Sequence, residues 1–307
     1  MPADIFAAHR TRLTDVAYRV LGSLADAEDV VQEAWLRWSA ADRSDVDNPQ
    51  AYLVTVTTRL AIDRLRRVRS RRESYPGPWL PEPVSTAPGL VEQVELAETV
   101  ELALLVVLET LSPLERAAFV LHEAFGLSYA EIGEVIGRTE AATRQLARRA
   151  RDHVREGRPR YDADRQRRRA LTERFLAACV GGSLDELMAM FTEDVQLVSD
   201  SGGKARAPLR TISGAEKVGR FLTAINTERG AQRFLDSVGA PTGLPFDVGV
   251  VDVNGAPAIV AGVAGRAVVV VSVVPDGDRI ATVYLMANPD KLAGVSHPDP
   301  AGASQGA

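Results

Sequence analysis

The sequence predicts a multidomain protein in which two all-α domains are followed by an α+β domain. Apolar residues recur at helical spacing through the first half of the chain, which is typical of helices that bury one face. A proline-rich stretch interrupts this pattern at residues 76–83. Residues 248–286 are instead rich in valine and isoleucine and contain two hairpin signals, Asn254-Gly255 and Asp276-Gly277. We therefore expect a separate domain with an antiparallel sheet in the last part of the chain.

The composition is that of an ordinary globular protein, with 307 residues of which 46% are hydrophobic and 25% are charged. The single cysteine, Cys179, excludes an internal disulfide and favours a reducing, cytoplasmic location. No apolar run is long enough to span a bilayer, and the N-terminal residues lack the apolar segment of a signal peptide. We expect no membrane association, and we find no pattern that indicates a cofactor or a metal site.

Three helices are predicted before the proline-rich stretch. The first ends at Gly22, the second covers residues 26–38, and the third begins at Asn48-Pro49, a cap followed by a first-turn proline. This third helix runs into an arginine cluster, because six of the nine residues 64–72 are arginine. A solvated helix end explains one or two of these cations through the helix dipole. The remaining cations indicate a phosphate-binding helix.

A helix-turn-helix is predicted in the next segment, after a region of helical spacing at residues 90–111. Two capping boxes, Ser112 to Glu115 and Ser128 to Glu131, begin two helices, and Thr139 caps a third that runs to about residue 155. On the third helix we expect the buried face to hold Ala142, Thr143, Leu146 and Ala150. The opposite face holds Ala141, Arg144, Gln145, Arg148, Arg151 and Arg155, which suits a helix in the major groove. The alternative is a solvated cationic face.

The second helix has a different character, because its acidic residues lie beside an apolar stripe. Asp26 and Asp29, followed by Gln32 and Glu33, give a surface that would repel DNA and attract a basic protein. Taken alone, this segment would be interpreted as a plain amphipathic surface helix.

Three segments in this order resemble one bacterial family. Asp26–Leu36 resembles the core-polymerase-binding helix of extracytoplasmic-function sigma factors. Residues Asn48–Leu53 and Ala61–Arg67 resemble the helix of that family that binds the −10 promoter element. Residues Leu111–Arg116 and Leu127–Ile132 resemble its helix-turn-helix, which reads the −35 element. The resemblance covers about residues 1–157.

The resemblance implies a role for individual residues of this chain. The residues implied to bind the polymerase core are Asp26, Asp29, Gln32 and Glu33. Those implied to bind the −10 element are Asn48, Arg59, Arg64, Arg66 and Arg67. Those implied to bind the −35 element are Arg144, Gln145, Arg148 and Arg151.

Three further motifs resemble signatures of one subgroup, whose members carry a fused SnoaL-like domain with a cone-shaped α+β fold. They are Trp79-Leu80-Pro81-Glu82-Pro83, Asp200-Ser201-Gly202-Gly203-Lys204 and Asn288-Pro289-Asp290-Lys291-Leu292. Ser201 stands where the subgroup usually has a further glycine. Large apolar side chains are unusual in a free linker, so we expect Trp79 and Leu80 to dock near the loop at residues 200–204. The residues implied to form this regulatory contact are Trp79, Leu80, Pro81, Glu82, Pro83, Asp200, Gly202, Gly203 and Lys204.

These patterns divide the chain as follows: sigma region 2 at 1–73, a linker at 74–111, region 4 at 112–160, a SnoaL-like domain at 168–292 and a disordered tail at 293–307. The implied function is to direct the RNA polymerase core, through its β′ and β subunits, to promoter DNA, with catalysis left to the polymerase. The C-terminal domain would regulate this activity in cis.

Several alternatives remain open at this level. The chain could be a stand-alone helix-turn-helix regulator, although such a regulator has no use for the 26–36 helix. The C-terminal domain could sense a small ligand in an apolar cavity. It could also be an enzyme that uses an aspartate as general base, from among Asp194, Asp200, Asp247 and Asp252, although aspartates at strand ends more often form turns.

Overall fold

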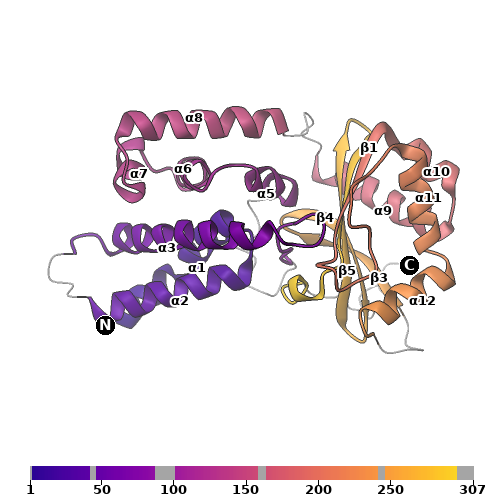
Figure 1. Cartoon of the computed structure of the whole chain (residues 1–307), viewed down its shortest axis with the longest axis horizontal. Coiled ribbons are helices and arrows are strands. Elements are labelled where there is room, and N and C mark those ends of the chain that lie inside the picture. Colours follow the sequence, from indigo (N-terminus) through magenta and orange to yellow (C-terminus); the bar gives the residue numbers. More distant parts are fainter. Residues whose placement is uncertain (1, 42–45, 87–100, 158–163, 241–245, 296–307) are drawn as a thin grey trace. The chain divides into compact units, whose positions relative to one another are not determined.

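The computed structural model describes residues 2–41, 46–86, 101–157, 164–240 and 246–295 (Figure 1). The chain divides into two compact units. Unit 1 comprises residues 1–74 and 91–158, and unit 2 comprises residues 75–90 and 159–307. The expected tail lies outside the described residues from residue 296 onward, as does the first half of the 90–111 segment.

The N-terminal half of unit 1 contains α1 (Pro2–Leu21), α2 (Leu24–Ala40) and α3 (Pro49–Arg72), which pack on one another. The expected end of α1 and the expected start of α3 are confirmed, whereas α2 is two residues longer at each end than the expected 26–38. Gly22 takes a left-handed φ of 71° directly after α1. The Ser23 hydroxyl caps α2 by accepting a hydrogen bond from the Asp26 amide, and Asn48 Oδ1 caps α3 by accepting one from the Ala51 amide. Fully buried side chains at the centre of the three helices include Leu13, Tyr18, Leu53 and Leu65.

The rest of unit 1 contains α5 (Leu102–Glu109), α6 (Pro113–Glu123), α7 (Tyr129–Ile136) and α8 (Glu140–Gly157). Both predicted capping boxes are present, at Ser112 and Ser128. α7 ends at Gly137 with a left-handed φ of 67°, and α8 follows as the second helix of the helix-turn-helix.

The buried face of α8 differs slightly from the expected one. Ala142 and Leu146 are only half-buried, and the buried row consists of Thr143, Ala147, Ala150 and Val154. This row follows the spacing i, i+4, i+7, i+11, which forms a continuous stripe along a helix. On the opposite face Ala141, Arg144, Gln145, Arg148 and Arg155 are exposed, as predicted, whereas Arg151 is half-buried.

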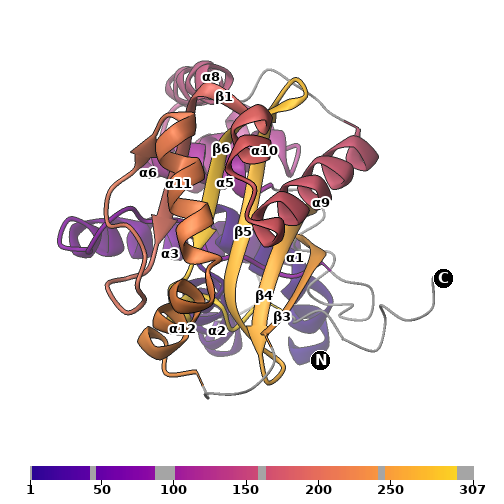
Figure 2. The same ribbon diagram turned by 90° about the vertical axis from the view of Figure 1, so that its right-hand side faces the viewer.

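Unit 2 is an α+β domain. Its helices are α9 (Arg165–Gly181), α10 (Leu184–Met190), α11 (Ala215–Ile225) and α12 (Glu228–Ser237). Its strands are β1 (Phe191–Asp200), β2 (Ile212–Ser213), β3 (Phe246–Val253), β4 (Ala256–Val263), β5 (Arg266–Asp276) and β6 (Arg279–Met286), followed by the short 3-10 helix η1 (Pro289–Lys291). Figure 2 shows α9, α10 and α11 over one face of the sheet. Apolar side chains from these helices and from β1, β4, β5 and β6 fill the space between the layers.

The sheet is mixed, not purely antiparallel as the sequence suggested. The strand order is β2-β1-β6-β5-β4-β3, and β1 pairs with β6 in parallel. After α11 and α12 the chain enters the far edge of the sheet at β3, antiparallel to β1, and the three hairpins that follow reverse it three times, so that β6 lies beside β1 in the same direction. The meander from β3 to β6 is antiparallel, and the turn at Asn254-Gly255 has φ values of 52° and 69°, as its sequence predicts. The hairpin at Ala264-Gly265 was not predicted, because alanine rarely takes the φ of 54° found there.

The helix-turn-helix requires a glycine at residue 133. A Cβ atom at this position would lie 2.6 Å from the carbonyl oxygen of Arg138 in the turn before α8. We predict that Gly133→Ala lowers the free energy of unfolding by about 1–3 kcal/mol, since the backbone must shift to relieve the contact. The measurement is urea denaturation followed by circular dichroism. The control is Gly181→Ala at the end of α9, where the added Cβ meets nothing within 4 Å. Equal urea midpoints for the two variants would contradict this account.

Candidate nucleic-acid and protein-binding surfaces

The outer face of α8 presents a row of exposed polar side chains. Arg144, Gln145 and Arg148 all point to solvent, and the Arg148 side chain is 80% exposed. Arg144 pairs with Glu140 at 2.6 Å and Arg148 lies 3.8 Å from Asp152, both within the helix. Such exposed i, i+4 pairs contribute little free energy, so both guanidinium groups are available to DNA.

Arg151, predicted for the same surface, has a different environment. It is half-buried, its Nη2 donates to the hydroxyl of Tyr129 at 2.9 Å, and its Nε lies 3.6 Å from Glu123. It therefore links α8 to α6 and α7. The sequence could not distinguish it from its neighbours, because its partners belong to other helices.

The acidic face of α2 is divided between exposed residues and residues that are paired. Gln32, Glu33 and Asp29 are exposed, and Leu36 beside them is 59% exposed. Asp26 is instead bound to Arg64 of α3, whose Nε donates to Asp26 Oδ1 at 2.9 Å. Arg64 also donates to Asp29 at 3.0 Å. The hydrogen bond to Asp26 raises the pKa of Arg64.

The other residues predicted for the −10 element also have partners inside unit 1. Asn48 caps α3. Arg66 and Arg67 are exposed, and both donate to Asp63 on the same helix. Arg59 donates to the carbonyl oxygens of Val135 and Glu134 at 2.9 and 2.8 Å. Arg59 and Arg64 are therefore bound to groups on other helices of unit 1, whereas Arg66 and Arg67 donate within α3.

In unit 2 the carboxylate of Asp200, at the end of β1, is fully buried. It accepts hydrogen bonds from the Tyr75 hydroxyl at 2.5 Å, the Leu80 amide at 2.9 Å and the Gly202 amide at 3.1 Å. Lys291 forms a buried ion pair with it at 2.6 Å. We refer to Asp200 and these four donors as the Asp200 centre.

Lys291 ties the proline-rich segment more closely to this centre. Its ammonium donates to the Leu80 carbonyl at 2.7 Å and lies 3.0 Å from the centroid of the Trp79 ring. Burial, together with the hydrogen bond to Asp200, raises the pKa of Tyr75. The predicted docking of Trp79 and Leu80 beside the 200–204 loop thus agrees with the contacts in the structure.

The following residues continue this contact along the edge of the sheet. Val84 exchanges hydrogen bonds with Asn254, and the Thr86 amide donates to the Asp252 carbonyl at 2.9 Å. Leu80 and Val84 are each 1% exposed, so residues 75–86 are an integral part of unit 2. The segment interpreted as one linker, 74–111, thereby contributes to both units, since α5 belongs to unit 1.

The glycine loop needs its two glycines and tolerates the serine. Gly202 and Gly203 have φ values of 58° and 70°, and a Cβ on Gly202 would lie 2.6 Å from the Asn288 amide nitrogen. Ser201 is not left-handed, and its hydroxyl accepts from the Gly203 amide. Lys204 is exposed and pairs with Asp290 at the rim of the loop.

Sequence reasoning missed two residues of the Asp200 centre. Tyr75 precedes the proline-rich motif and carried no signal of its own. Lys291 lies inside a motif that the sequence singled out, and its burial could have been suspected only from its place in that motif.

Comparison with known proteins places the chain in a family. The Sigma-70 region 2 model matches residues 5–72, and the Sigma-70 region 4 model matches residues 101–154. The chain is 40% identical to the ECF RNA polymerase sigma factor SigJ of Mycobacterium tuberculosis over 96% of its own length and 94% of that protein. The chain belongs to the extracytoplasmic-function RNA polymerase sigma factors.

Two further similarities agree with this assignment. The chain is 35% identical to the probable sigma factor SigI of M. tuberculosis, over 69% of its length and 72% of that protein. The crystal structure of M. tuberculosis SigJ superposes with a TM-score of 0.73 at 37% identity, covering 95% of this chain and 98% of that one. The interpretation as a stand-alone regulator is thereby excluded, because the function of this family is to direct RNA polymerase to promoters.

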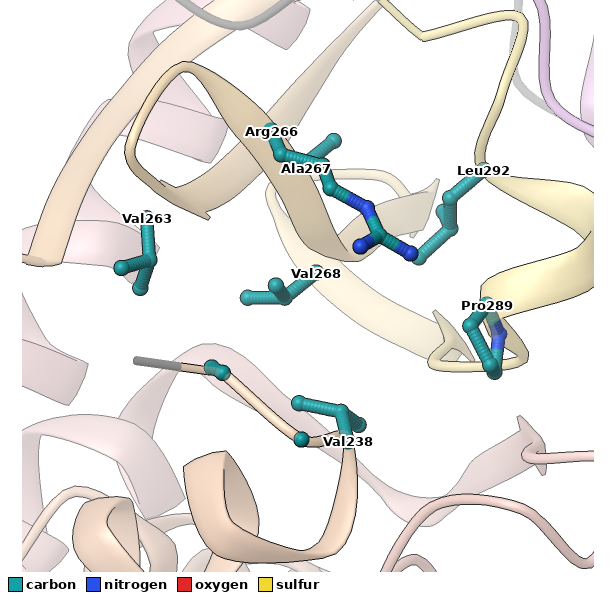
Figure 3. Close-up of a pocket in the computed structure, with 9 residues that line it drawn as sticks. Val238, Val263, Arg266, Ala267, Val268, Pro289 and Leu292 are labelled. Carbon is teal, nitrogen blue, oxygen red and sulfur yellow. The ribbon is translucent and has the colours of Figure 1, made fainter. Parts of the chain in front are cut away.

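Two of the four aspartates considered as a general base, Asp200 and Asp252, are bound to other side chains of the C-terminal domain. Both oxygens of Asp200 are occupied by donors, and Asp252 pairs with Arg165 at 2.5 Å. A cavity beside α12 measures about 40 Å³, enough for a few water molecules (Figure 3). Its lining includes Val238, Val263, Arg266, Ala267, Val268, Pro289 and Leu292. Ligand pockets in proteins are commonly of the order of 300–1,000 Å³.

The described part of the sigma factor has neither a bilayer-spanning helix nor a cluster of metal-binding side chains. None of its described helices combines the length and the hydropathy that a bilayer-spanning helix needs. Within the same residues, no group of three histidine, cysteine or acidic side chains is placed to hold a metal ion.

The Asp200 centre gives a matched pair of lysines for a stability test. We predict that Lys291→Met lowers the free energy of unfolding of unit 2 by about 3–5 kcal/mol, because it leaves a buried carboxylate without its cation. Lys204→Met removes an exposed ion pair to Asp290 and should cost under about 1 kcal/mol. Thermal unfolding of the full chain measures both effects. A similar loss for the two variants would show that burial of the Asp200 pair is not what stabilises the unit.

Proposed function

We propose that this sigma factor binds the polymerase core through the exposed face of α2. Asp29, Gln32 and Glu33 form this face together with the exposed Leu36, which gives a basic partner both charge and apolar contact. Asp26 does not belong to this exposed face, because its ion pair with Arg64 joins α2 to α3. The partner on the polymerase is the basic coiled coil of the β′ subunit, and the β subunit receives the helix-turn-helix.

The DNA contacts follow from the same exposure pattern. Arg66 and Arg67 of α3 neutralise phosphates at the −10 element, and Arg144, Gln145 and Arg148 of α8 read base edges at the −35 element. Catalysis stays with the polymerase, so this chain is not an enzyme. It acts in the cytoplasm, where polymerase and promoter DNA are found.

We further propose that the C-terminal domain regulates the sigma factor in cis. The observation that carries this proposal is the burial of residues 75–86 against Asp200. Only Glu73 and Ser74 separate this segment from α3. In the C-terminal direction, the chain continues from residues 75–86 to α5 and the helix-turn-helix. The C-terminal domain thus holds the connection between the −10 helix and the −35 helix, and release of that connection would change how the two are spaced on a promoter.

The regulatory role predicts an effect of Leu80→Asp in the full chain. A charge at this 1% exposed site should release residues 75–86 and change run-off transcription at least about threefold, on promoters selected with the wild-type chain. The control is Val180→Asp on α9, where the valine is 68% exposed. Higher transcription from Leu80→Asp would identify the C-terminal domain as inhibitory. Lower transcription would identify it as supporting the sigma factor. Equal transcription from folded Leu80→Asp and wild type would contradict regulation through this segment.

Polymerase binding is tested on α2. Gln32→Ala combined with Glu33→Arg should weaken the affinity for core polymerase at least tenfold, about 1.4 kcal/mol, because the new cation faces a basic surface. These positions avoid the ion pairs of Arg64, so the fold is preserved. Gln166→Ala with Glu173→Arg on α9 makes the same changes on another exposed helix with a similar i, i+4 pair. Fluorescence titration with core polymerase is the measurement, and unchanged affinity would refute the assignment of this face.

A further inference from the structure

Tyr129 lies at the start of α7, beside the exposed face of α8. It directly follows Ser128, whose hydroxyl accepts a hydrogen bond from the Glu131 amide at 3.3 Å. The Glu131 carboxylate accepts in return from the Ser128 amide at 2.8 Å, so a complete capping box holds the backbone of this turn. The tyrosine side chain is half-buried, because it projects from this turn toward α8. Local sequence thus fixes the point from which the ring extends.

Side chains from α6 and α8 hold the tyrosine ring in one orientation. The imidazole of His122 in α6 stacks on the ring, with the two ring centroids 4.3 Å apart and the planes inclined by 28°. The imidazole is itself held in place, because its Nδ1 donates to the Leu127 carbonyl at 2.9 Å. On α8, Arg151 Nη2 donates to the tyrosine hydroxyl at 2.9 Å. The ring is therefore fixed at its face by α6 and at its hydroxyl by α8.

The same ring contacts Arg144, which is proposed above to read a base edge. The central guanidinium carbon of Arg144 lies 5.5 Å from the ring centroid, within the range of a cation–π interaction. Its Nη2 also donates to Glu140 in the first turn of α8 at 2.6 Å. An exposed arginine loses rotamer freedom when it binds a base, and a guanidinium that is already held on a ring has less freedom to lose.

We propose that Tyr129 is a positioning residue for promoter recognition, whose ring holds the Arg144 guanidinium in the orientation that donates to one base of the −35 element. Guanine offers two neighbouring acceptors in the major groove, N7 and O6, and a guanidinium donates to both only when its plane is aligned with them. A base without this pair of acceptors gains nothing from the alignment. Tyr129 therefore sets base preference from outside the reading helix. The inference rests on the proposed role of Arg144 at the −35 element.

A purely structural role of Tyr129 makes a different prediction. If the ring only packed α6, α7 and α8 together, its loss would weaken binding to every DNA sequence alike. If it positions Arg144, its loss weakens binding to the preferred base and leaves binding to other sequences unchanged. The ratio of the two affinities separates these roles.

The test measures base preference in polymerase core loaded with each variant of the full chain. The probe is a fluorescein-labelled promoter fragment selected from random DNA with the wild-type protein, and comparison fragments carry one changed base pair each in the −35 element. The preference at a position is the ratio of the two Kd values from fluorescence anisotropy. Arg144→Ala should identify the position that it reads by lowering the preference there about tenfold. Tyr129→Leu should lower the preference at the same position about threefold and leave the Kd for a fragment without a promoter unchanged.

Two further variants serve as controls. Tyr129→Phe keeps the ring beside Arg144 and removes only the hydroxyl that binds Arg151, so it should retain the wild-type preference. Phe125→Leu is the matched ring deletion. The Phe125 ring also contacts two arginines, Arg12 and Arg19, but both belong to α1, so this variant should leave the preference unchanged.

The outcomes separate this inference from the role of Arg144 itself. Wild-type preference in Tyr129→Leu, together with its loss in Arg144→Ala, overturns the inference and leaves the role of Arg144 intact. An equal loss in Tyr129→Leu and Tyr129→Phe also overturns it, because the hydroxyl would then be responsible and not the ring. Unchanged preference in Arg144→Ala refutes the assignment of Arg144 to the −35 element, and this inference with it.

A double variant checks that the effect acts through Arg144. In the Arg144→Ala background, Tyr129→Leu should cause no further loss of preference, since the group that the ring positions is already absent. A further loss of the same size would show that the ring acts on another contact and would overturn the inference. If Tyr129→Leu fails to fold, Tyr129→Met takes its place, because its flexible side chain fills the space without a ring.

Discussion

The buried carboxylate of Asp200 is the constraint on which the C-terminal unit depends. A carboxylate without solvent is unstable unless donors surround it, and here the donors come from residues 75–80, from the glycine loop and from η1. These segments are far apart in the sequence, so only one tertiary arrangement satisfies the charge. The ring of Trp79 over Lys291 closes the centre on one side. The proline-rich segment is consequently a structural part of the domain, and it cannot leave without exposing Leu80 and Val84 to water.

A second buried carboxylate plays the same part in unit 1. The Glu109 carboxylate forms ion pairs with Arg72 and Arg116, and the Glu109 carbonyl oxygen accepts a hydrogen bond from Arg69. Arginine suits this use because its planar fork binds two acceptors at once and stays charged when buried. The consequence is that α3 has two sets of cations, one directed into the unit and one directed to solvent. The solvent-facing Arg66 and Arg67 are available to DNA, whereas Arg59 lies between the two sets.

The described core of the C-terminal unit consists of closely packed apolar side chains. Leu197, Leu222 and Phe175 belong to the core between sheet and helices, and the cavity near Arg266 is small. The Asp200 centre lies instead at the C-terminal end of β1, where Asp200 binds residues 75–80 of the same chain. Because Asp200 accepts hydrogen bonds from Tyr75 and Leu80 of the same chain, the domain is suited to holding residues 75–86 in place.

The sequence alone determined most of the local structure. Capping residues such as Ser112, Ser128 and Asn48 act within three residues of themselves, and the Asn254-Gly255 turn depends only on the φ values that its residues tolerate. The order of the motifs likewise predicted the family, and helical periodicity predicted the exposed face of α8. The tertiary structure decided which charges are paired, because an ion pair such as Arg64 with Asp26 joins positions that no local pattern connects. It also decided the parallel pairing of β1 with β6, and it gave Arg59 and Arg151 hydrogen-bond partners on other helices. The physical reason is the same in each case: propensity and capping are local, whereas the cost of burying a charge is settled only by the groups that folding brings around it.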